Sequence, residues 1–500
     1  MGFMRERHDM NEFDLKDYMI TIRDSIQKRI LQQINGANPS IKNLCSYLAL
    51  NSIVKPEINS ILVEEGFLPL NKSSSHIMYT INKIIEHLEG SGNSHKNDYL
   101  TVKDSIVRRE MRSIELFGRG NDNIPNIMVT LDASMLENPK VFEELILGGM
   151  TIARINCAHD NLDIWKSLIH TLRATEERMN NTADATISSC KIYIDLPGPK
   201  IRIGKLKVSK QKGEYIKVKK GDTLRIYRDC HYLGSPSSNE TPASIGITIP
   251  KALRNVRVGD RVSIDDGKIF AKVTSVQKEY IDSEIVLARN KVEKLKPNKG
   301  INFPDSLVHL SVPTVTEKDL TILENMHQEI DMVGISFINQ PKDIQIVKEK
   351  IEQLTSGKIG IIAKIETKQA LFSLSQIILE GLNHQPFGVM IARGDLAVEI
   401  GKEQLASAQE GIMEICDAGH VPIIWATGVL DRMNKKNIPS ISEITDAYWG
   451  LRADCIMLNK GPYVPYSIEF IHQLDQINKD NMFQSRDSLL PFVQYGFKFD

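Results

Sequence analysis

The chain has 500 residues, 62 of them Lys or Arg and 63 Asp or Glu, so its formal net charge is −1. A single core of ordinary size does not accommodate this length, and two or three domains are expected. The near-zero charge argues against nucleic acid or a membrane surface as the main partner, so any binding of anions must be local.

The six cysteines are scattered, with no C-x-x-C pair and no metal-type cluster among them. This usage is typical of a reduced chain. The sequence begins with a stretch rich in charge, and it contains no apolar run of signal-peptide or transmembrane length. We therefore expect a soluble protein of the cytoplasm.

The first part of the chain has helical periodicity. Apolar residues from Leu15 to Ile30 recur at spacings of three and four, which predicts a helix over about 14–34. A second stripe predicts a helix over 77–88, and the serines at 73–75 could cap it. The polar run at 90–98 is typical of a linker. We expect an N-terminal helical extension over 1–120.

The pattern changes at about residue 126 to short apolar runs separated by amphipathic helical stretches. The eight runs are 126–131, 151–158, 191–196, 332–337, 360–366, 387–393, 422–427 and 455–459. Nearly continuous apolar runs suit strands buried on both faces, and their alternation with helices indicates parallel pairing. The sequence thus predicts the α/β class, with a (β/α)8 TIM barrel over 121–204 and 299–480 and a C-terminal tail over 481–500.

The third and fourth runs are separated by a long insert, 205–298, instead of one helix. Apolar and polar residues alternate along it, and Gly-Asp pairs at 221–222 and 259–260 are typical of turns. These features predict a small all-β domain, a β-barrel placed as a lid on the loop face of the TIM barrel.

Charged and polar residues follow several of these runs, and barrel active sites lie at the C-terminal ends of the strands. They are Arg154, Asn156 and His159 for the second run, Asp195, Lys200 and Arg202 for the third, Lys364 and Glu366 for the fifth, Arg393 and Asp395 for the sixth, and Thr427 for the seventh. Two carboxylates on neighbouring strands, Glu366 and Asp395, can chelate a hard divalent cation. The cations opposite them can hold a phosphate or a carboxylate.

Taken singly, most of these residues also fit a simpler interpretation. A charged residue at a strand end is most often a solvated start of a loop, and His159 alone fits a structural or peripheral role. Lys364 and Glu366 are different, because they point to the same face of a strand that is otherwise too apolar to be exposed. Burying a charged pair without a purpose is costly, so this pair indicates a functional site.

Six segments together resemble the pyruvate kinase family. They are ARINCAHD (153–160), IDDGKI (264–269), KGINFP (299–304), TVTEKD (314–319), IAKIE (362–366) and MIARGDLAVE (390–399). The resemblance runs in order from about 126 to 470 and includes the inserted domain at the expected point. It is strongest to a divergent branch with a helical N-terminal extension and no C-terminal effector domain.

The resemblance implies transfer of a phosphoryl group from phosphoenolpyruvate to ADP, giving pyruvate and ATP, in a homo-oligomer. By the same resemblance, Glu366 and Asp395 bind Mg²⁺ or Mn²⁺, and Lys364 stabilises the charge on the phosphoryl group during its transfer. The backbone at Arg393 and Gly394 holds the pyruvate carboxylate, and Thr427 lies near the methyl carbon. The other implied contacts are Arg154 and Arg202 with phosphate, Asp266 of the lid over the site, and Asn156, His159, Arg154 and Lys299 with the nucleotide.

Three departures from the family pattern lie at the positions that bind a monovalent cation in much of the family. Where much of the family has oxygen ligands for K⁺, this chain has Ala158, Leu196 and Lys200. We therefore predict that the Lys200 ammonium, paired with Asp195, stands in for the monovalent cation and that K⁺ is not required.

Other departures concern the nucleotide side and the rim of the barrel. Asp132-Ala133, Gly428, Ile441 and Asn459-Lys460-Gly461 replace the usual residues. Three hypotheses stay open: a pyruvate kinase, a kinase-like barrel with altered nucleotide or acceptor specificity, and a non-catalytic protein that senses a metabolite and recruits partners.

Overall fold

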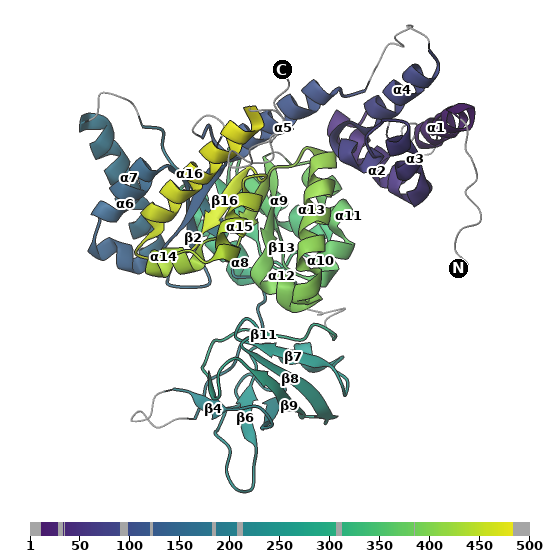
Figure 1. Ribbon diagram of the computed structural model, residues 1–500. Helices are drawn as coiled ribbons and strands as arrows, with labels where there is room; N and C mark the ends of the chain where they lie inside the picture. The colour runs from purple at the N-terminus through teal and green to yellow at the C-terminus, as the bar shows by residue number, and fades with distance from the viewer. Residues whose placement is uncertain are drawn as a thin grey trace, which may run out of the picture.

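The structure is a computed structural model that describes residues 12–28, 34, 36–90, 99–120, 124–182, 187–207, 214–306, 313–384 and 386–483. A central α/β barrel carries a β domain at one end and a group of helices beside the other end (Figure 1). The linker expected at 90–98 and the tail expected at 481–500 lie almost wholly outside the described residues.

Eight parallel strands close the barrel. They are β1 (Asn126–Leu131), β2 (Met150–Asn156), β3 (Lys191–Asp195), β12 (Met332–Ile335), β13 (Gly360–Ile365), β14 (Phe387–Ala392), β15 (Ile423–Ala426) and β16 (Cys455–Leu458), in the spatial order β1-β16-β15-β14-β13-β12-β3-β2. The strands β1, β13 and β14 are buried along their whole length, because the barrel interior covers one face and helices cover the other. The predicted TIM barrel is confirmed, and each strand falls within or beside its apolar run.

Helices α6 to α16 surround the strands (Figure 1). They are α6 (Lys140–Gly148), α7 (Leu162–Thr182), α8 (Glu317–Met326), α9 (Pro341–Leu354), α10 (Lys368–Phe372), α11 (Leu374–Gly381), α12 (Arg393–Ile400), α13 (Leu405–Gly419), α14 (Asp431–Lys436), α15 (Ile441–Gly450) and α16 (Val464–Phe483). Capping boxes begin α8 at Thr316 and α15 at Ser440. These caps satisfy backbone N–H groups that a helix start leaves without partners.

The inserted domain is all-β and has its own hydrophobic core. Its strands are β4 (Ile216–Val218), β5 (Thr223–Tyr227), β6 (Ala243–Gly246), β7 (Arg261–Ile264), β8 (Ile269–Val276), β9 (Tyr280–Ala288), β10 (Glu293–Leu295) and β11 (Ile301–Asn302). A six-stranded sheet, β11-β7-β8-β9-β5-β6, packs with the two-stranded sheet β10-β4 instead of forming the expected closed β-barrel. The core includes Ile201 and Phe303, so the packed unit extends past 205–298 at both ends.

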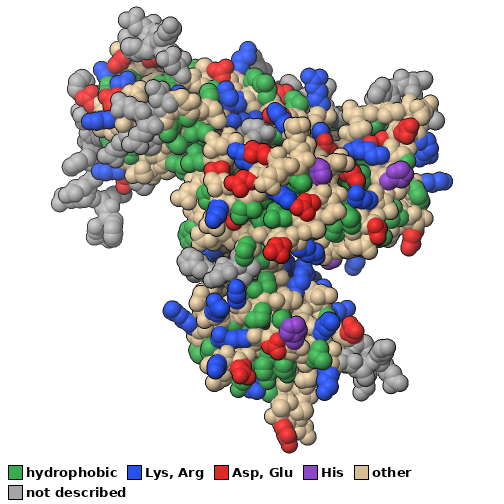
Figure 2. Space-filling view, turned by 180° about the vertical axis from the view of Figure 1, so that it is seen from behind, with side chains coloured by type: hydrophobic (Ala, Val, Ile, Leu, Met, Phe, Trp, Pro, Cys, Tyr) green, Lys and Arg blue, Asp and Glu red, His purple; other side chains and the backbone are tan. Residues whose placement is uncertain are grey.

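The inserted domain is also the basic part of the molecule. Residues 205–298 contain 20 Lys and Arg but 11 Asp and Glu, although the whole chain has a net charge of −1. Figure 2 shows many Lys and Arg side chains on this domain. The net charge of the chain is close to zero because the positive charge of the β domain is offset by negative charge in the rest of the chain.

The N-terminal extension is helical, as expected, with α1 (Glu12–Ile26), α2 (Pro39–Ile53), α3 (Pro56–Glu64), the 3₁₀ helix η2 (Leu70–His76), α4 (Ile77–Leu88) and α5 (Val102–Phe117). Within the helix predicted over 14–34, α1 covers residues to Ile26, residues 27–28 continue as π-helix, and residues 29–33 lie outside the described part of the chain. The predicted serine cap of α4 is wrong. The serines belong to η2, the residue before α4 is His76, and Ser74 instead donates a hydrogen bond to Asp417 on the barrel.

Helix α5 closes the N-terminal end of the barrel. Its last residues, Leu116 and Phe117, are buried in the same cluster as the inward-facing side chains of the strands. Strands β13 and β14 make room for Leu116 with glycines: a Cβ on Gly360 or on Gly388 would lie 2.6 Å from a Leu116 methyl carbon. The extension is therefore part of the barrel core and not an appendage.

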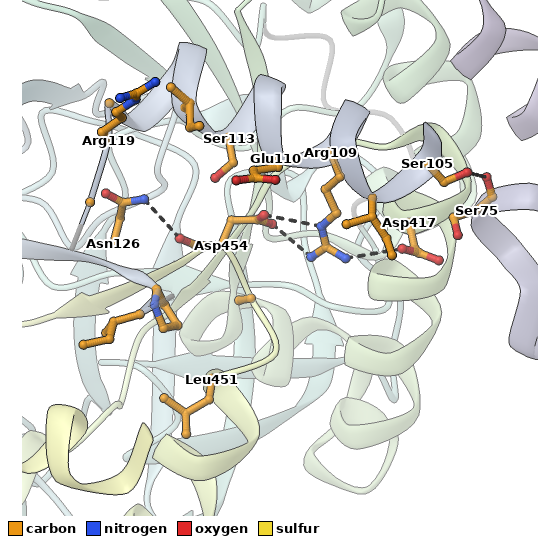
Figure 3. Close-up of a pocket in the computed structure, with 17 residues that line it drawn as sticks. Ser75, Ser105, Arg109, Glu110, Ser113, Arg119, Asn126, Asp417, Leu451 and Asp454 are labelled. Carbon is orange, nitrogen blue, oxygen red and sulfur yellow. Dashed lines mark hydrogen bonds and ion pairs between the residues drawn. The ribbon is translucent and has the colours of Figure 1, made fainter. Parts of the chain in front are cut away.

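Arg109 attaches α5 to the outside of the barrel (Figure 3). Its guanidinium contacts Asp454 at 3.0 Å and Asp417 at 3.3 Å. A cavity of about 660 Å³ lies beside this contact, lined by α5 and by residues such as Asn126 at the start of β1. The cavity is thus at the opposite end of the barrel from the C-terminal ends of the strands. No helix in the described residues is long and apolar enough to cross a membrane.

Candidate active site

A buried cluster of four charged side chains lies inside the C-terminal end of the barrel. The Lys364 ammonium is 2.8 Å from Asp195 Oδ1 and 2.8 Å from Glu366 Oε1. The Arg154 guanidinium contacts Asp195 Oδ2 at 2.5 Å. Each of the four residues is at most 8% exposed. Two cations and two anions balance one another, which is the condition under which charges can be buried.

The charges of the cluster hold one another in their ionised forms. Burial alone would raise the pKa of the Asp195 carboxyl, but Lys364 and Arg154 overcome that effect, and the pKa of Asp195 lies below its ordinary value. Burial likewise opposes the charge of Lys364, yet Asp195 and Glu366 keep the pKa of the ammonium above its ordinary value. Lys364 is therefore a fixed positive charge at neutral pH.

Three uncharged residues that the sequence did not single out complete the cluster. Ser336 accepts a 2.6 Å hydrogen bond from Lys364, and Thr130 accepts a 2.8 Å hydrogen bond from Arg154. Tyr193 donates to Asp195 at 3.3 Å. Each is a hydroxyl residue in or directly after a predicted strand, and this was the only signal that could have identified them.

A glycine makes the space for Tyr193. A Cβ on Gly334 of the neighbouring strand β12 would lie 1.9 Å from the Tyr193 hydroxyl oxygen, a distance that no packing could tolerate. Tyr193 is fully buried and supports the cluster from within the barrel. Inward-facing side chains of this kind fill a TIM barrel and fix the position of the residues at its mouth.

Lys200 and Asp395 form a second group beside the cluster. The Lys200 ammonium contacts both carboxylate oxygens of Asp395, at 2.9 and 3.0 Å, and lies 3.7 Å from Asp266 of the lid. The expected ion pair between Asp195 and Lys200 is therefore wrong. Asp195 is already paired with Arg154 and Lys364 deeper in the barrel, whereas Lys200 follows a Pro-Gly-Pro corner that carries it across the mouth to the start of α12.

Glu366 and Asp395 face the same space. Burial raises the pKa of the Glu366 carboxyl, Lys364 opposes the rise, and the negative charge of Asp395 adds to it. Glu366 Oε2 also accepts a 2.8 Å hydrogen bond from the Phe337 N–H. Mg²⁺ commonly binds to one or two protein carboxylates and completes its shell with water and substrate oxygens. These two side chains fit such a site, provided that Lys200 shares Asp395 with the ion.

The described residues contain no group of three or more His, Cys, Asp and Glu side chains placed to hold a metal ion. A divalent ion at Glu366 and Asp395 would complete its shell with oxygens of water or of a substrate. This donor set suits an ion that arrives with a phosphate better than a resident structural metal.

The Arg393 side chain is buried, and protein groups occupy its guanidinium. It donates to the carbonyls of Ala426 and Thr427 at 2.7 and 2.8 Å, and it forms an ion pair with Asp446 of α15. Thr427 has φ of +65°, a conformation that is strained for a β-branched residue, and the bond from Arg393 supports it. Gly394 lies directly against Thr427, because a Cβ there would be 2.8 Å from its methyl carbon. Only the backbone of residues 393 and 394 thus remains for a ligand.

The lid residues meet one another at the base of the inserted domain. Asp265 pairs with Lys268 at 2.7 Å and with Lys299 at 2.9 Å, so the Lys299 ammonium is held by the loop that carries Asp266. Arg202 donates to the Asn298 carbonyl at 2.8 Å. The role of Lys299 in nucleotide binding stays a prediction.

Residues after β1, β2 and β16 form the rim on the side of the barrel expected for the nucleotide. Asn156 accepts a 3.1 Å hydrogen bond from the Ala158 N–H and so shapes the turn that presents His159. Burial lowers the pKa of His159, and the nearby charges of Lys460 and Arg202 lower it further. His159 is therefore neutral at neutral pH and lies near two cations.

Comparisons with known proteins identify the family to which the chain is similar. The family model for the barrel domain of pyruvate kinase matches residues 124–463. Pyruvate kinase of Geobacillus stearothermophilus is 30% identical over 353 residues, which are 69% of this chain and 55% of that protein. Pyruvate kinase of Dictyostelium discoideum is 31% identical over 330 residues, 64% of this chain and 60% of that protein. Pyruvate kinase of Thermococcus litoralis is 29% identical over 345 residues, 68% of this chain and 66% of that protein.

The matched region thus spans between about half and two thirds of these relatives. The family model covers most of the chain, and the residues that it matches include the whole buried cluster. The predicted resemblance is confirmed: the chain belongs to the pyruvate kinase family.

Proposed function

We propose that the protein transfers a phosphoryl group from phosphoenolpyruvate to ADP, giving pyruvate and ATP. The observation that carries the proposal is the buried cluster of Lys364 and Arg154 with Asp195 and Glu366, beside Asp395. Phosphoryl transfer depends on positioning and on neutralising charge more than on covalent chemistry by the protein. A cluster of fixed cations next to two metal-binding carboxylates supplies both.

In the proposed mechanism, Lys364 and Arg154 neutralise the phosphoryl group while its bond to the enolate oxygen breaks and its bond to the ADP oxygen forms. Mg²⁺ or Mn²⁺ at Glu366 and Asp395 supplies Lewis-acid stabilisation of the same charges when it is bound. The backbone N–H groups at the start of α12, at Arg393 and Gly394, hold the carboxylate of the substrate. Thr427 positions the donor that protonates the methylene carbon, which gives pyruvate.

The inserted domain fits the same proposal. Its surplus of Lys and Arg raises the local concentration of anionic substrates, and Asp266 contacts Lys200 at 3.7 Å at the mouth. Closure over the mouth excludes water, which otherwise competes with ADP for the phosphoryl group. We further propose that Lys200 supplies the charge that K⁺ supplies in much of the family, that the protein is a cytoplasmic homo-oligomer, and that K⁺ is not required.

A coupled assay for pyruvate formation with Mg²⁺, phosphoenolpyruvate and a series of nucleoside diphosphates tests the reaction. Turnover with at least one diphosphate, and its loss in Lys364→Met, supports the proposal. His159→Ala is the matched variant at the rim, and it should retain more activity than Lys364→Met. If phosphoenolpyruvate binds and no diphosphate is phosphorylated, the proposal is wrong.

A second candidate is phosphoryl transfer to a different acceptor, and the ion pair between Asp132 and Lys460 at the rim favours it. A carboxylate at the end of β1 opposes the approach of phosphate groups. The series of diphosphates separates the two candidates, because a changed acceptor would give turnover with another nucleotide and little with ADP.

A further inference from the structure

The outer face of the two-stranded sheet in the inserted domain carries a group of lysines. Strands β4 and β10 are antiparallel, and Lys217 lies directly opposite Lys294. Both lysines are exposed, whereas the residues on either side of Lys217 are buried. Because alternate residues of a strand share a face, Lys219 and Lys296 continue the outer face along each strand. Together with Tyr215, which directly precedes β4 on the same face, these four lysines form the lysine face.

The arrangement of charge on the lysine face does not favour folding. Like charges directly opposite each other on antiparallel strands are destabilising, and Lys217 and Lys294 are such a pair. Other cations of the domain have an acidic partner, as Arg225 has in Asp282 at 2.8 Å. The four lysines of the face, in contrast, form no ion pair with any residue that the structure describes. Their charge is therefore available to an anion from outside the chain.

The surroundings of the lysine face add to its positive charge. Lys220, which follows β4, and Lys291, which precedes β10, are also exposed. The one acid of β10, Glu293, alternates with Lys294 and so lies on the other face, where it accepts hydrogen bonds from Asn290. The inserted domain as a whole carries 20 Lys and Arg against 11 Asp and Glu. Positive charge is thus concentrated on this domain and continuous over the sheet.

Tyr215 gives the lysine face an aromatic surface. The Lys294 ammonium lies 4.5 Å from the centre of the Tyr215 ring, which is a cation–π contact. Proteins that bind single-stranded nucleic acid combine a basic surface with aromatic side chains on which bases stack. The lysines recur at alternate positions on both strands, so they can hold several phosphates of one chain at once. Lysine binds a phosphate as a point charge and does not read a base.

Other anionic partners fit the lysine face less well. The carboxylates of an acidic peptide are bound best by the planar fork of arginine, and all four cations of the face are lysines. Binding to a membrane surface grows with the apolar area that inserts into it, and Val292 beside β10 is the one exposed large hydrophobic residue next to the described strands of this sheet. A phosphate backbone with stackable bases matches both the lysines and Tyr215.

We propose that the lysine face binds single-stranded nucleic acid without sequence preference, with phosphates on the lysines and a base stacked on Tyr215. The net charge of −1 argues against nucleic acid as the main partner of the chain, but the separation of charge allows a local site. In Figure 1, β4 lies farther from the barrel than β11 does, so the face is separate from the candidate active site. The inference does not depend on the proposed phosphoryl transfer.

The test measures how fluorescein-labelled oligouridylate and oligodeoxythymidylate bind to the full chain, by fluorescence anisotropy over a range of KCl concentrations. Four phosphate contacts predict a slope of about −3 for the logarithm of the binding constant against that of the salt concentration, because each contact on a single strand contributes about −0.7. Lys217→Gln/Lys294→Gln removes two contacts, so binding should weaken and the slope should change to about −1.4. Tyr215→Leu should weaken binding about tenfold and leave the slope unchanged, because stacking releases no counterions.

Two controls exclude trivial causes. Lys251→Gln/Lys278→Gln removes the same charge from exposed lysines elsewhere in the inserted domain and should keep the wild-type slope. Equal losses in the two double variants would contradict the proposal, because the charge of the whole domain would then be the cause. The Tm of Lys217→Gln/Lys294→Gln should be no lower than that of the wild type, since a like-charge pair is removed. Weaker binding would then not come from unfolding.

Other anions complete the test. Binding of either oligonucleotide supports the proposal, and the two oligonucleotides distinguish RNA from DNA. Vesicles that contain phosphatidylserine and poly-glutamate are titrated in the same buffer, and tighter binding of either would contradict the proposal in favour of a membrane or an acidic protein. Failure to bind both oligonucleotides at low salt would also contradict it. Excess ADP should not displace the oligonucleotide, because displacement would locate it in the candidate active site instead.

Discussion

The Lys200 ammonium lies against both carboxylate oxygens of Asp395, at 2.9 and 3.0 Å, on the side chain proposed as a metal ligand. A cation built into the chain would therefore share this carboxylate with a divalent ion bound at the proposed site. At the proposed site, Lys200 would be both a competitor of the metal and a partner for the negative charge of the substrate.

Replacement of Lys200 should separate these two effects. In Lys200→Gln the carboxylate of Asp395 loses its ammonium partner, so Mg²⁺ or Mn²⁺ should bind more tightly, while kcat falls because a positive charge is missing at the mouth. Titration with Mn²⁺ followed by electron paramagnetic resonance measures the first effect, and the coupled assay measures the second. Lys268→Gln, whose ammonium pairs with Asp265, is the control and should leave Mn²⁺ affinity unchanged. Weaker Mn²⁺ binding in Lys200→Gln would contradict this interpretation.

The dependence on monovalent cations provides a separate test of Lys200. We expect the wild-type rate to be the same in KCl, NaCl and tetramethylammonium chloride at equal ionic strength, because the ammonium is part of the chain. Strong activation by K⁺ alone would show that Lys200 does not replace it.

Asp195 should control the pH profile through Lys364. The carboxylate raises the pKa of the Lys364 ammonium. In Asp195→Asn this support is lost, so the pKa of Lys364 falls and the alkaline limb of kcat/KM moves to lower pH. Ser336→Ala removes a hydrogen-bond acceptor of Lys364 without changing the charge, and its alkaline limb should stay closer to that of the wild type. The prediction fails if the two variants shift the limb equally.

Glu399 should make stability depend on pH near neutrality. Burial raises the pKa of its carboxyl to about 7 from 4.5, and Asn302 donates a 3.3 Å hydrogen bond to it. The folded chain holds this proton more strongly than the unfolded chain, so the contribution to stability is complete below pH 4.5 and is lost as the pH rises through about 7.

In Glu399→Gln the side chain stays neutral at every pH. The decline in Tm between pH 5 and pH 8 should therefore be smaller than in the wild type, and the difference corresponds to at most about 3 kcal/mol. Glu403→Gln replaces an exposed glutamate three residues beyond the end of α12, the helix that carries Glu399, and should keep the wild-type decline. Parallel curves of Tm against pH for the wild type and Glu399→Gln would contradict the assignment.

The contact between α5 and the barrel strands predicts a coupled pair of substitutions. Gly388→Ala places a Cβ 2.6 Å from a Leu116 methyl carbon, so it should lower the free energy of unfolding by about 1–3 kcal/mol. Leu116→Ala leaves a cavity and should cost about 2–5 kcal/mol. In the double variant the new methyl group occupies part of that cavity, so the loss should be smaller than the sum of the two.

Denaturant unfolding measures these values. Gly411→Ala adds a methyl group where no atom lies within 4 Å, in the helix α13, and is the control that should not destabilise the protein. If the losses in the free energy of unfolding for Gly388→Ala and Leu116→Ala are strictly additive, the packing of Leu116 against β14 does not couple the extension to the barrel.

The local pattern of the sequence was sufficient for the framework. Apolar runs long enough to be buried on both faces predicted all eight barrel strands, and alternation predicted the β domain, because side-chain periodicity is a property of each segment. The spacing of Lys364 and Glu366 likewise predicted that both side chains point to the same face, and in the structure they contact each other at 2.8 Å. The bounds of α4 were predicted correctly, but its cap was not, because the serines at 73–75 belong to the preceding 3₁₀ helix.

Only the tertiary structure decided which charges meet. Asp195 and Lys200 are five residues apart and were expected to pair, yet Asp195 binds Arg154 and Lys364, and Lys200 binds Asp395. Barrel closure brings the ends of distant strands together, and the lowest-energy pairing depends on all the charges that meet there. The burial of Leu116 inside the barrel was likewise not predictable from the sequence. It depends on side chains from several strands that are far apart in the chain and meet only in the fold.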